Sequence, residues 1–229
     1  MRITVFGAHG STGRLLTAAA LDQGHEVVAV TRRPEEYPLA HPALTVAGAD
    51  VHHPAAVAGA ITGADAVLST LGVPSTRDPI TVYSEGTRTI ADAMAAADVK
   101  RLVVVSSSAT YPHHHADGGF LLNRVLQPLV TRTIGRTTYA DMRAMEDLVR
   151  DSALAWTVMR PSGLFDLPAP TAYRLDEDEA PGVFTARSDL AASMLEMLRD
   201  DRYVGRHVAV TTTEVRPSML RMMLNEAFG

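Results

Sequence analysis

Three glycines near the start of the chain have the spacing of a phosphate-binding turn. Gly7, Gly10 and Gly13 form a G-x-x-G-x-x-G pattern between an apolar stretch at 3–6 and a helical apolar pattern at 15–21. Glycine lets the chain turn sharply, lets the backbone approach a pyrophosphate and lets a helix pack closely on a strand. The N–H groups that begin the helix would then face the anion. The pattern predicts a strand, an anion-binding turn and a helix, the alternative being a turn that binds nothing.

The residues after the second predicted strand bear on the choice of dinucleotide. Residues 25–31 have a strand pattern, and Arg32 and Arg33 follow where NAD sites usually carry Asp or Glu. A guanidinium there would pair with the 2′-phosphate of NADP. The alternative is a solvated arginine pair, neutralised by Glu35 and Glu36. We expect NADP(H) to be favoured over NAD(H).

Strand and helix patterns then alternate, which places the chain in the α/β class. Strands are predicted at 44–47, 65–71 and 101–105, and helices at 55–61 and 80–97. Short turns between them favour a doubly wound parallel sheet, in which ligands bind beyond the carboxyl ends of the strands. The predicted strand ends are the glycine turn, Arg32, Asp50, Gly72 and Ser106 to Ser108.

Beyond Ser108 the pattern is less regular. Helices are predicted at 120–134, 139–152, 188–198 and from Pro217 onwards, and strands at 155–160 and 206–210. Thr137 or Thr138 would cap the helix at 139–152. Weak strand signals surround Ala172 and Val183, and the acidic run 176–179 between them is expected to be a solvated loop.

Composition excludes several classes of function. The chain has 229 residues, a length sufficient for one large α/β domain, and 46% of them are hydrophobic. The absence of cysteine excludes disulfides and thiol catalysis, and a net charge of −5 gives no general attraction to nucleic acid. No apolar run reaches the roughly 20 residues of a membrane span, and the first strand begins at once, leaving no room for a signal peptide. We expect a cytoplasmic monomer or homodimer.

A run of three histidines, at 113–115, raises the question of a metal site. Adjacent side chains in an extended segment point in alternate directions, and no carboxylate follows at helical spacing. A solvated loop is the interpretation we favour, and we predict no metal.

Together these residues resemble the atypical short-chain dehydrogenase/reductases of the NmrA-like and biliverdin-IXβ/flavin reductase group. The resemblance implies a single NAD(P)-binding Rossmann domain over 1–229, whose part at about 163–229 covers the substrate. It spans essentially the whole chain and rests on residues 7–13, 48–51, 71–72, 79–86, 106–109, 152–161 and 188–191.

The resemblance also implies roles for individual residues. The pyrophosphate would be held by Gly7, His9, Gly10, Ser11, Thr12 and Gly13, and the 2′-phosphate by Arg32. Asp50 and Val51 would border the adenine, and Leu71 and Gly72 the ribose. The nicotinamide pocket would be formed by Ser106, Ser107, Pro161, Ser162, Gly163 and Leu164. Ser108 occupies the place of a serine near the substrate of the flavin reductases, whereas Met142 replaces a histidine that borders their site.

The chain lacks the Tyr-x-x-x-Lys proton relay of most short-chain dehydrogenases. Its one lysine, Lys100, precedes a strand, and Tyr139 has Arg143 at the fourth position, which cannot shuttle a proton. Hydride transfer to a planar acceptor such as a flavin or quinone needs little such help. Ser108 and Tyr111 are the hydroxyls that we expect to orient a small-molecule substrate or donate a proton.

The first hypothesis is therefore an NADPH-dependent oxidoreductase acting on a planar acceptor. A second is an NmrA-like regulator that binds NAD(P) without turnover. A third is a biosynthetic ketoreductase, epimerase or dehydratase acting on a dedicated intermediate.

Overall fold

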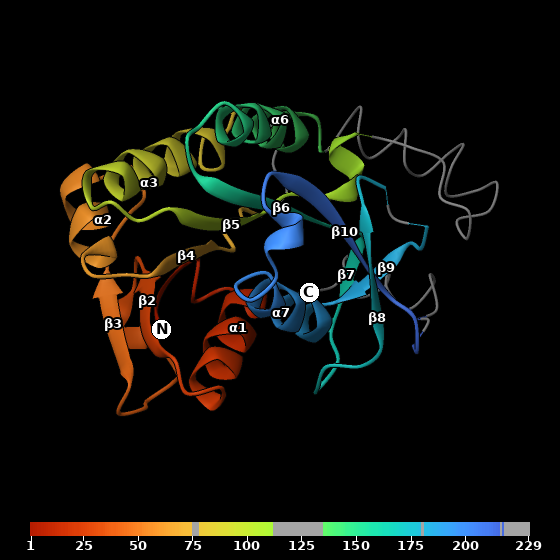
Figure 1. Cartoon of the computed structure of the whole chain (residues 1–229), viewed down its shortest axis with the longest axis horizontal. Coiled ribbons are helices and arrows are strands. Elements are labelled where there is room, and N and C mark those ends of the chain that lie inside the picture. Colours follow the sequence, from red (N-terminus) through yellow and green to blue (C-terminus); the bar gives the residue numbers. More distant parts are fainter. Residues whose placement is uncertain (75–77, 112–134, 180, 216, 218–229) are drawn as a thin grey trace.

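A twisted, mostly parallel sheet forms the middle layer of the protein (Figure 1). The computed structural model describes residues 1–74, 78–111, 135–179, 181–215 and 217. Within these residues the sheet has eight strands in the order β3-β2-β1-β4-β5-β6-β10-β8, and β8 alone is antiparallel to its neighbour. The strands are β1 (Arg2–Phe6), β2 (Glu26–Thr31), β3 (Leu44–Gly48), β4 (Ala66–Ser69), β5 (Arg101–Val105), β6 (Ala155–Pro161), β8 (Tyr173–Glu177) and β10 (Arg206–Thr212).

Helices cover both faces of the sheet. The helices are α1 (Ser11–Asp22), α2 (Pro54–Ile61), α3 (Ser84–Ala96), α6 (Arg136–Arg150) and α7 (Arg187–Glu196). Figure 1 shows α2, α3 and α6 on one face and α1 with α7 on the other, each above its own apolar core. Because the inner strands are covered on both sides, their residues are apolar in succession rather than alternately. The prediction of a doubly wound α/β fold is confirmed.

A small second sheet follows β6. It pairs β7 (Gly163–Phe165) with β9 (Phe184–Ala186) in parallel, and the Phe165 and Phe184 rings meet edge to face 6.4 Å apart. Three short 3-10 helices complete the described structure: Pro34–Glu36, Ser108–Thr110 and Asp201–Tyr203.

Two local predictions were wrong. Neither Thr137 nor Thr138 caps α6, because both lie inside this helix. It begins at Arg136, before the predicted start at 139, and Gly135 is in the capping position. The acidic run 176–179 is not wholly a loop, since its first two residues end β8. An edge strand leaves one side open to solvent, where charged side chains are tolerated.

Some predictions lie outside the described residues. These are the helix at 120–134, the terminal helix beyond Pro217 and the histidine run at 113–115. In the described part of the chain, no helix combines the length and the apolar character needed to cross a membrane.

The helix predicted from residue 80 begins at Ser84, and a residue distant in the sequence supplies its cap. Asp141 of α6 accepts hydrogen bonds from the backbone N–H groups of Tyr83 (2.8 Å) and Ser84 (3.3 Å), and from the Ser84 hydroxyl. Asp141 is buried, so α6 satisfies the otherwise unpaired donors that begin α3. The contact fastens α3 to α6 on one face of the sheet.

Replacing Asp141 with alanine is expected to lower the free energy of unfolding by about 1–3 kcal/mol, because it leaves buried donors without an acceptor. Asp147→Ala is the matched control on the same helix. Asp147 is exposed and pairs only with neighbouring Arg150 among the described residues, so its loss should change stability by less than about 0.5 kcal/mol. Urea unfolding of the two variants measures both values, and equal losses would contradict this account of the cap.

Candidate functional site

A cavity of about 740 Å³ opens at the carboxyl ends of the central parallel strands. This is the edge at which doubly wound sheets bind ligands. Thirteen of the predicted cofactor-site residues line it: Gly7, His9, Gly10, Ser11, Thr12, Arg32, Arg33, Asp50, Val51, Leu71, Gly72, Ser106 and Leu164. The structure thus brings together residues from the ends of β1 to β5 and from β7, whereas their individual roles stay predictions.

The glycine turn is shaped by close backbone contacts. Gly7 has a positive φ of 73°, and a side chain there would stand 2.6 Å from the carbonyl oxygen of Thr70. Gly13 does not line the cavity; it lies beneath the turn, where a Cβ atom would come within 2.2 Å of the Gly7 oxygen. Glycine at these positions therefore lets α1 start directly against β1.

The start of α1 fits an anionic group. Gly10 occupies the capping position, and among the described residues no side chain caps the helix. Its first N–H groups are therefore left for a ligand, and the helix dipole adds to their attraction for negative charge. His9 borders the same space, and its buried Nδ1 has no hydrogen-bond partner in the described structure. These features suit a pyrophosphate.

The two arginines after β2 differ in their contacts. Arg33 pairs with Glu36 at 2.8 Å, whereas Arg32 makes no ion pair within the described residues. Arg32 and Asp50 also line an adjoining hollow of about 400 Å³. Asp50 accepts hydrogen bonds from the backbone N–H of His52 and from its ring, which lower the pKa of Asp50. The Arg32 guanidinium is exposed beside this hollow, and its role toward a phosphate stays a prediction.

Parts of the cavity wall come from residues that do not follow a strand of the parallel sheet. Tyr83 and Met142 are both buried and come from the start of α3 and from α6, while Arg187 begins α7. Burial raises the pKa of Tyr83, although the backbone N–H of Val73 opposes this shift. The family resemblance places Met142 at the border of the site, whereas no local signal in the sequence indicates that Tyr83 or Arg187 would line the cavity. Other lining residues that the predictions missed include Phe6, Val30, Thr31, Ala49, His52, Thr70, Val73, Pro74, Val82 and Val105.

Ser106 borders the cavity with its hydroxyl already engaged. It donates to Glu146 Oε1 over 2.5 Å, and Glu146 is buried against Arg160 Nη2 at 2.5 Å and His207 Nε2 at 3.4 Å. Trp156 packs on the His207 ring at 5.3 Å between ring centres. This polar cluster joins α6 to β5, β6 and β10 behind the cavity wall.

The remaining predicted site residues are not among the described residues that line the cavity. Ser107 caps a 3-10 turn by accepting from the Ala109 N–H, and the buried Ser108 donates to Ser162 over 3.4 Å. Tyr111 is 43% exposed, with the Arg160 guanidinium 4.8 Å from its ring centre. Pro161 and Gly163 flank Ser162 at the junction of β6 and β7. A catalytic role for Ser108 or Tyr111 stays a prediction.

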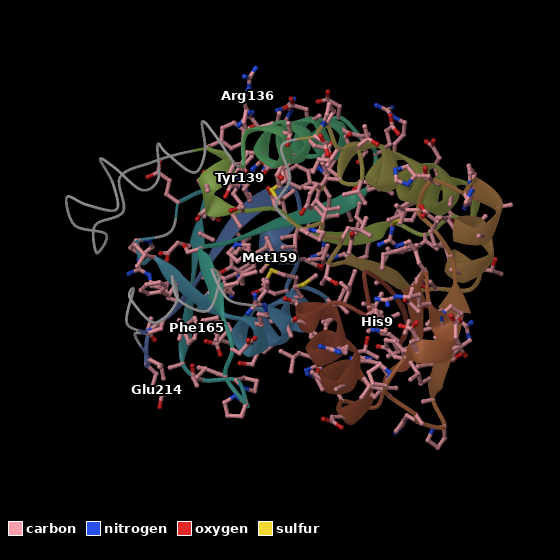
Figure 2. All side chains as sticks on the ribbon, turned by 180° about the vertical axis from the view of Figure 1, so that it is seen from behind. His9, Arg136, Tyr139, Met159, Phe165 and Glu214 are labelled. Carbon is pink, nitrogen blue, oxygen red and sulfur yellow. The ribbon has the colours of Figure 1, made fainter. Side chains whose placement is uncertain are left out.

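The residues at the positions of a Tyr-x-x-x-Lys pair are on α6. Arg143 donates to the backbone carbonyl of Thr110 at 3.0 Å, so it holds the loop after β5. Figure 2 shows Tyr139 in α6 and His9 near the start of α1, in separate parts of the molecule. In the described part of the chain, no three histidine or carboxylate side chains gather as metal ligands.

The fold and this cavity define a dinucleotide-binding protein of the doubly wound α/β class. Residues 7–201 match the model of the NAD(P)H-binding family, and the chain belongs to that family. The prediction of an NAD(P)H-binding family member is confirmed.

Known proteins and solved structures are similar to all or part of the chain. The chain is similar to a short-chain dehydrogenase/reductase of Veillonella parvula solved with NADP, with a TM-score of 0.78 and 19% identity over 95% of this chain and 99% of that one. It is 42% identical over 108 residues to an uncharacterized protein of Mycobacterium tuberculosis, spanning 47% of this chain but 12% of that protein. A 3-beta-hydroxysteroid dehydrogenase of Mycolicibacterium neoaurum is 31% identical over 119 residues, which are 47% of this chain and 32% of the enzyme.

Gly13→Ala is expected to weaken NADPH binding by at least tenfold, because the added methyl must push α1 away from the Gly7 carbonyl. Gly59→Ala is the matched control. Gly59 is exposed in α2 with open space around it, so alanine should stabilise the helix by about 0.5–1 kcal/mol without affecting binding. NADPH fluorescence titration measures the affinities, and unchanged binding by Gly13→Ala would refute the packing argument.

His207 should make stability depend on pH. Burial and Arg160 lower its pKa below the usual 6.5, with Glu146 and Asp178 acting in the opposite direction. The unfolded state then takes up the proton more readily, so the contribution of neutral His207 is present above about pH 6.5 and is lost as pH falls through the folded pKa. His207→Gln should flatten the fall in melting temperature between pH 7 and pH 5. The pKa of His25 is also lowered, so some slope will persist, but an unchanged slope would contradict the assignment.

Proposed function

We propose that the chain is an NADPH-dependent reductase of a planar, electron-accepting small molecule such as a flavin or quinone. The observation that carries the choice of NADPH is Arg32, an exposed guanidinium at the end of β2 that lines both hollows and makes no ion pair within the described residues. A guanidinium binds phosphate through a charge-assisted fork, and a 2′-phosphate would be its partner.

The protein residues bind and orient the reactants in this proposal. The uncapped start of α1 and His9 hold the pyrophosphate, Arg32 holds the 2′-phosphate, and Asp50 with Val51 border the adenine. Val105, Met142 and Leu164 give the remaining part of the cavity an apolar wall against which a planar ring can stack. When bound, NADPH supplies a hydride: the acceptor gains two electrons and one hydrogen, takes a second proton from water, and NADP⁺ is left.

The absence of a tyrosine–lysine relay supports an acceptor that needs little acid catalysis. Arg143 stands at the lysine position and is engaged with the Thr110 carbonyl. Partial burial and the carboxylates of Glu146 and Asp147 raise the pKa of Tyr111, which makes that hydroxyl a weak acid. Reduction of a quinone or flavin can draw its proton from solvent, whereas reduction of an isolated ketone depends on a positioned acid.

The same absence of a relay favours one second candidate. A sensor that binds NAD(P) without turnover would use the same cavity and would have no use for a proton donor. The two candidates differ in turnover alone.

Arg32→Ala is expected to raise the dissociation constant of NADPH by roughly 10- to 100-fold and to leave that of NADH nearly unchanged, since a charge-assisted hydrogen bond contributes about 1.5–3 kcal/mol. Fluorescence titration measures binding, and oxidation of NADPH at 340 nm with FMN, riboflavin and a set of quinones measures turnover. The wild type should turn over at least one acceptor and prefer NADPH.

Arg88→Ala, on the exposed side of α3 and away from the cavity, controls for the loss of a surface arginine. Equal loss of NADPH and NADH affinity in Arg32→Ala would contradict the 2′-phosphate assignment. Tight binding of NADPH with no acceptor reduced would refute the reductase and support the sensor.

A further inference from the structure

The arginines of the cavity come from two separate parts of the chain. Arg32 and Arg33 follow β2, whereas Arg187 is the first residue of α7, and Asp50 is the one carboxylate among the described residues of the lining. Asp50 lies near Arg32, which helps to lower its pKa, and is hydrogen-bonded to His52. The carboxylate therefore balances charge at the β2 end, and Arg187 faces the cavity without an acidic residue of the described wall beside it.

The backbone below Arg187 is held firmly. The Ser188 hydroxyl donates to the Ala169 carbonyl at 3.0 Å. The fully buried Asp189 accepts from the Thr171 N–H at 2.6 Å and from the Thr212 hydroxyl at 2.5 Å. These contacts bind the start of α7 to β10 and to the segment before β8, so the Arg187 side chain extends from a fixed base.

The partner of Arg187 is easily exchanged. Its Nη1 meets Asp166 Oδ1 at 2.9 Å, but the Asp166 side chain is 79% exposed while that of Arg187 is 26% exposed. An ion pair with so exposed a carboxylate contributes about 0–1 kcal/mol. An anion within the cavity can therefore replace or join Asp166 at little cost, and it would meet a guanidinium that is already largely desolvated.

We propose that Arg187 binds a carboxylate, sulfonate or phosphate of the substrate, so that the reductase prefers anionic planar acceptors to neutral ones. The proposal rests on the proposed function and narrows its substrate class. The pyrophosphate of the cofactor is the other possible anion, but the uncapped N–H groups of α1 and the unpartnered His9 already suit it. We expect residues from about 163 onwards to cover the substrate. Leu164 and Arg187 are the described residues of this part of the chain that line the cavity.

Acceptor pairs that differ in charge but share a ring system test the proposal. FMN and riboflavin form one pair, and 1,4-naphthoquinone-2-sulfonate and 1,4-naphthoquinone form the other. The wild type should have the lower KM for the anionic member of each pair. Arg187→Gln should raise KM for the anionic members at least tenfold and leave the neutral members nearly unchanged. Arg187→Lys, which keeps the charge but not the fork, should retain part of the preference.

Two controls separate this role from others. Asp166→Asn removes the exchangeable partner and should keep or strengthen the preference for anions. NADPH titration of Arg187→Gln should give a dissociation constant within about threefold of the wild-type value, equivalent to about 0.65 kcal/mol. A larger loss of NADPH affinity with the acceptor preference intact would assign Arg187 to the cofactor and overturn the proposal.

Equilibrium binding distinguishes failure of this proposal from failure of the proposed function. FMN and riboflavin are titrated by flavin fluorescence into protein saturated with NADP⁺, with circular dichroism confirming that each variant is folded. Selective loss of FMN binding in Arg187→Gln would support the subsite even if no acceptor is reduced. Turnover with equal KM for both members of each pair would overturn the subsite and leave the reductase standing.

Discussion

The close approach of Gly13 to the Gly7 carbonyl decides how α1 meets β1. With hydrogen in place of a side chain at Gly13, the helix can begin within van der Waals contact of the turn, and the positive φ of Gly7 carries the chain past Thr70 at the end of β4. The helix start is thereby held at the sheet edge where the other strands end. Because β1 is an inner strand that pairs with β2 and β4, the junction lies between the cavity residues that follow those two strands.

Local patterns were sufficient to predict the parallel strands of the sheet and the cavity residues that follow them. The glycine spacing, the apolar strands and the residues that end them, such as Arg32 and Ser106, are each encoded within a few neighbouring positions. The carboxyl ends of parallel strands necessarily meet at one edge, so the strand order did not have to be known. For the same reason the cavity residues at the strand ends were easier to predict than those that come from α3 and α7.

What could not be predicted depends on contacts between distant residues. The start of α3 is fixed by Asp141, 57 positions beyond Ser84, and no local capping residue announces it. Arg187 lines the cavity because α7, which is distant from α1 in the sequence, packs along it on the same face of the sheet. Tyr83 stands at the start of α3, where its backbone N–H donates to Asp141 of α6 and its side chain is buried in the cavity wall. The edge strand β8 has alternating polar residues and forms only by pairing with β10.

The placement of the acidic residues on β8 has a consequence for how separate molecules meet. An edge strand offers unpaired backbone groups to any extended segment, including the same strand of another copy. Asp176 and Glu177 lie on that edge, with Arg174 beside Asp176 and Arg206 of β10 near Glu177. Asp176 is mostly buried, but the exposed side chains of Arg174, Glu177 and Arg206 would lose solvent if two such edges came together. These exposed charges disfavour edge-to-edge pairing of β8 with the same strand of another copy.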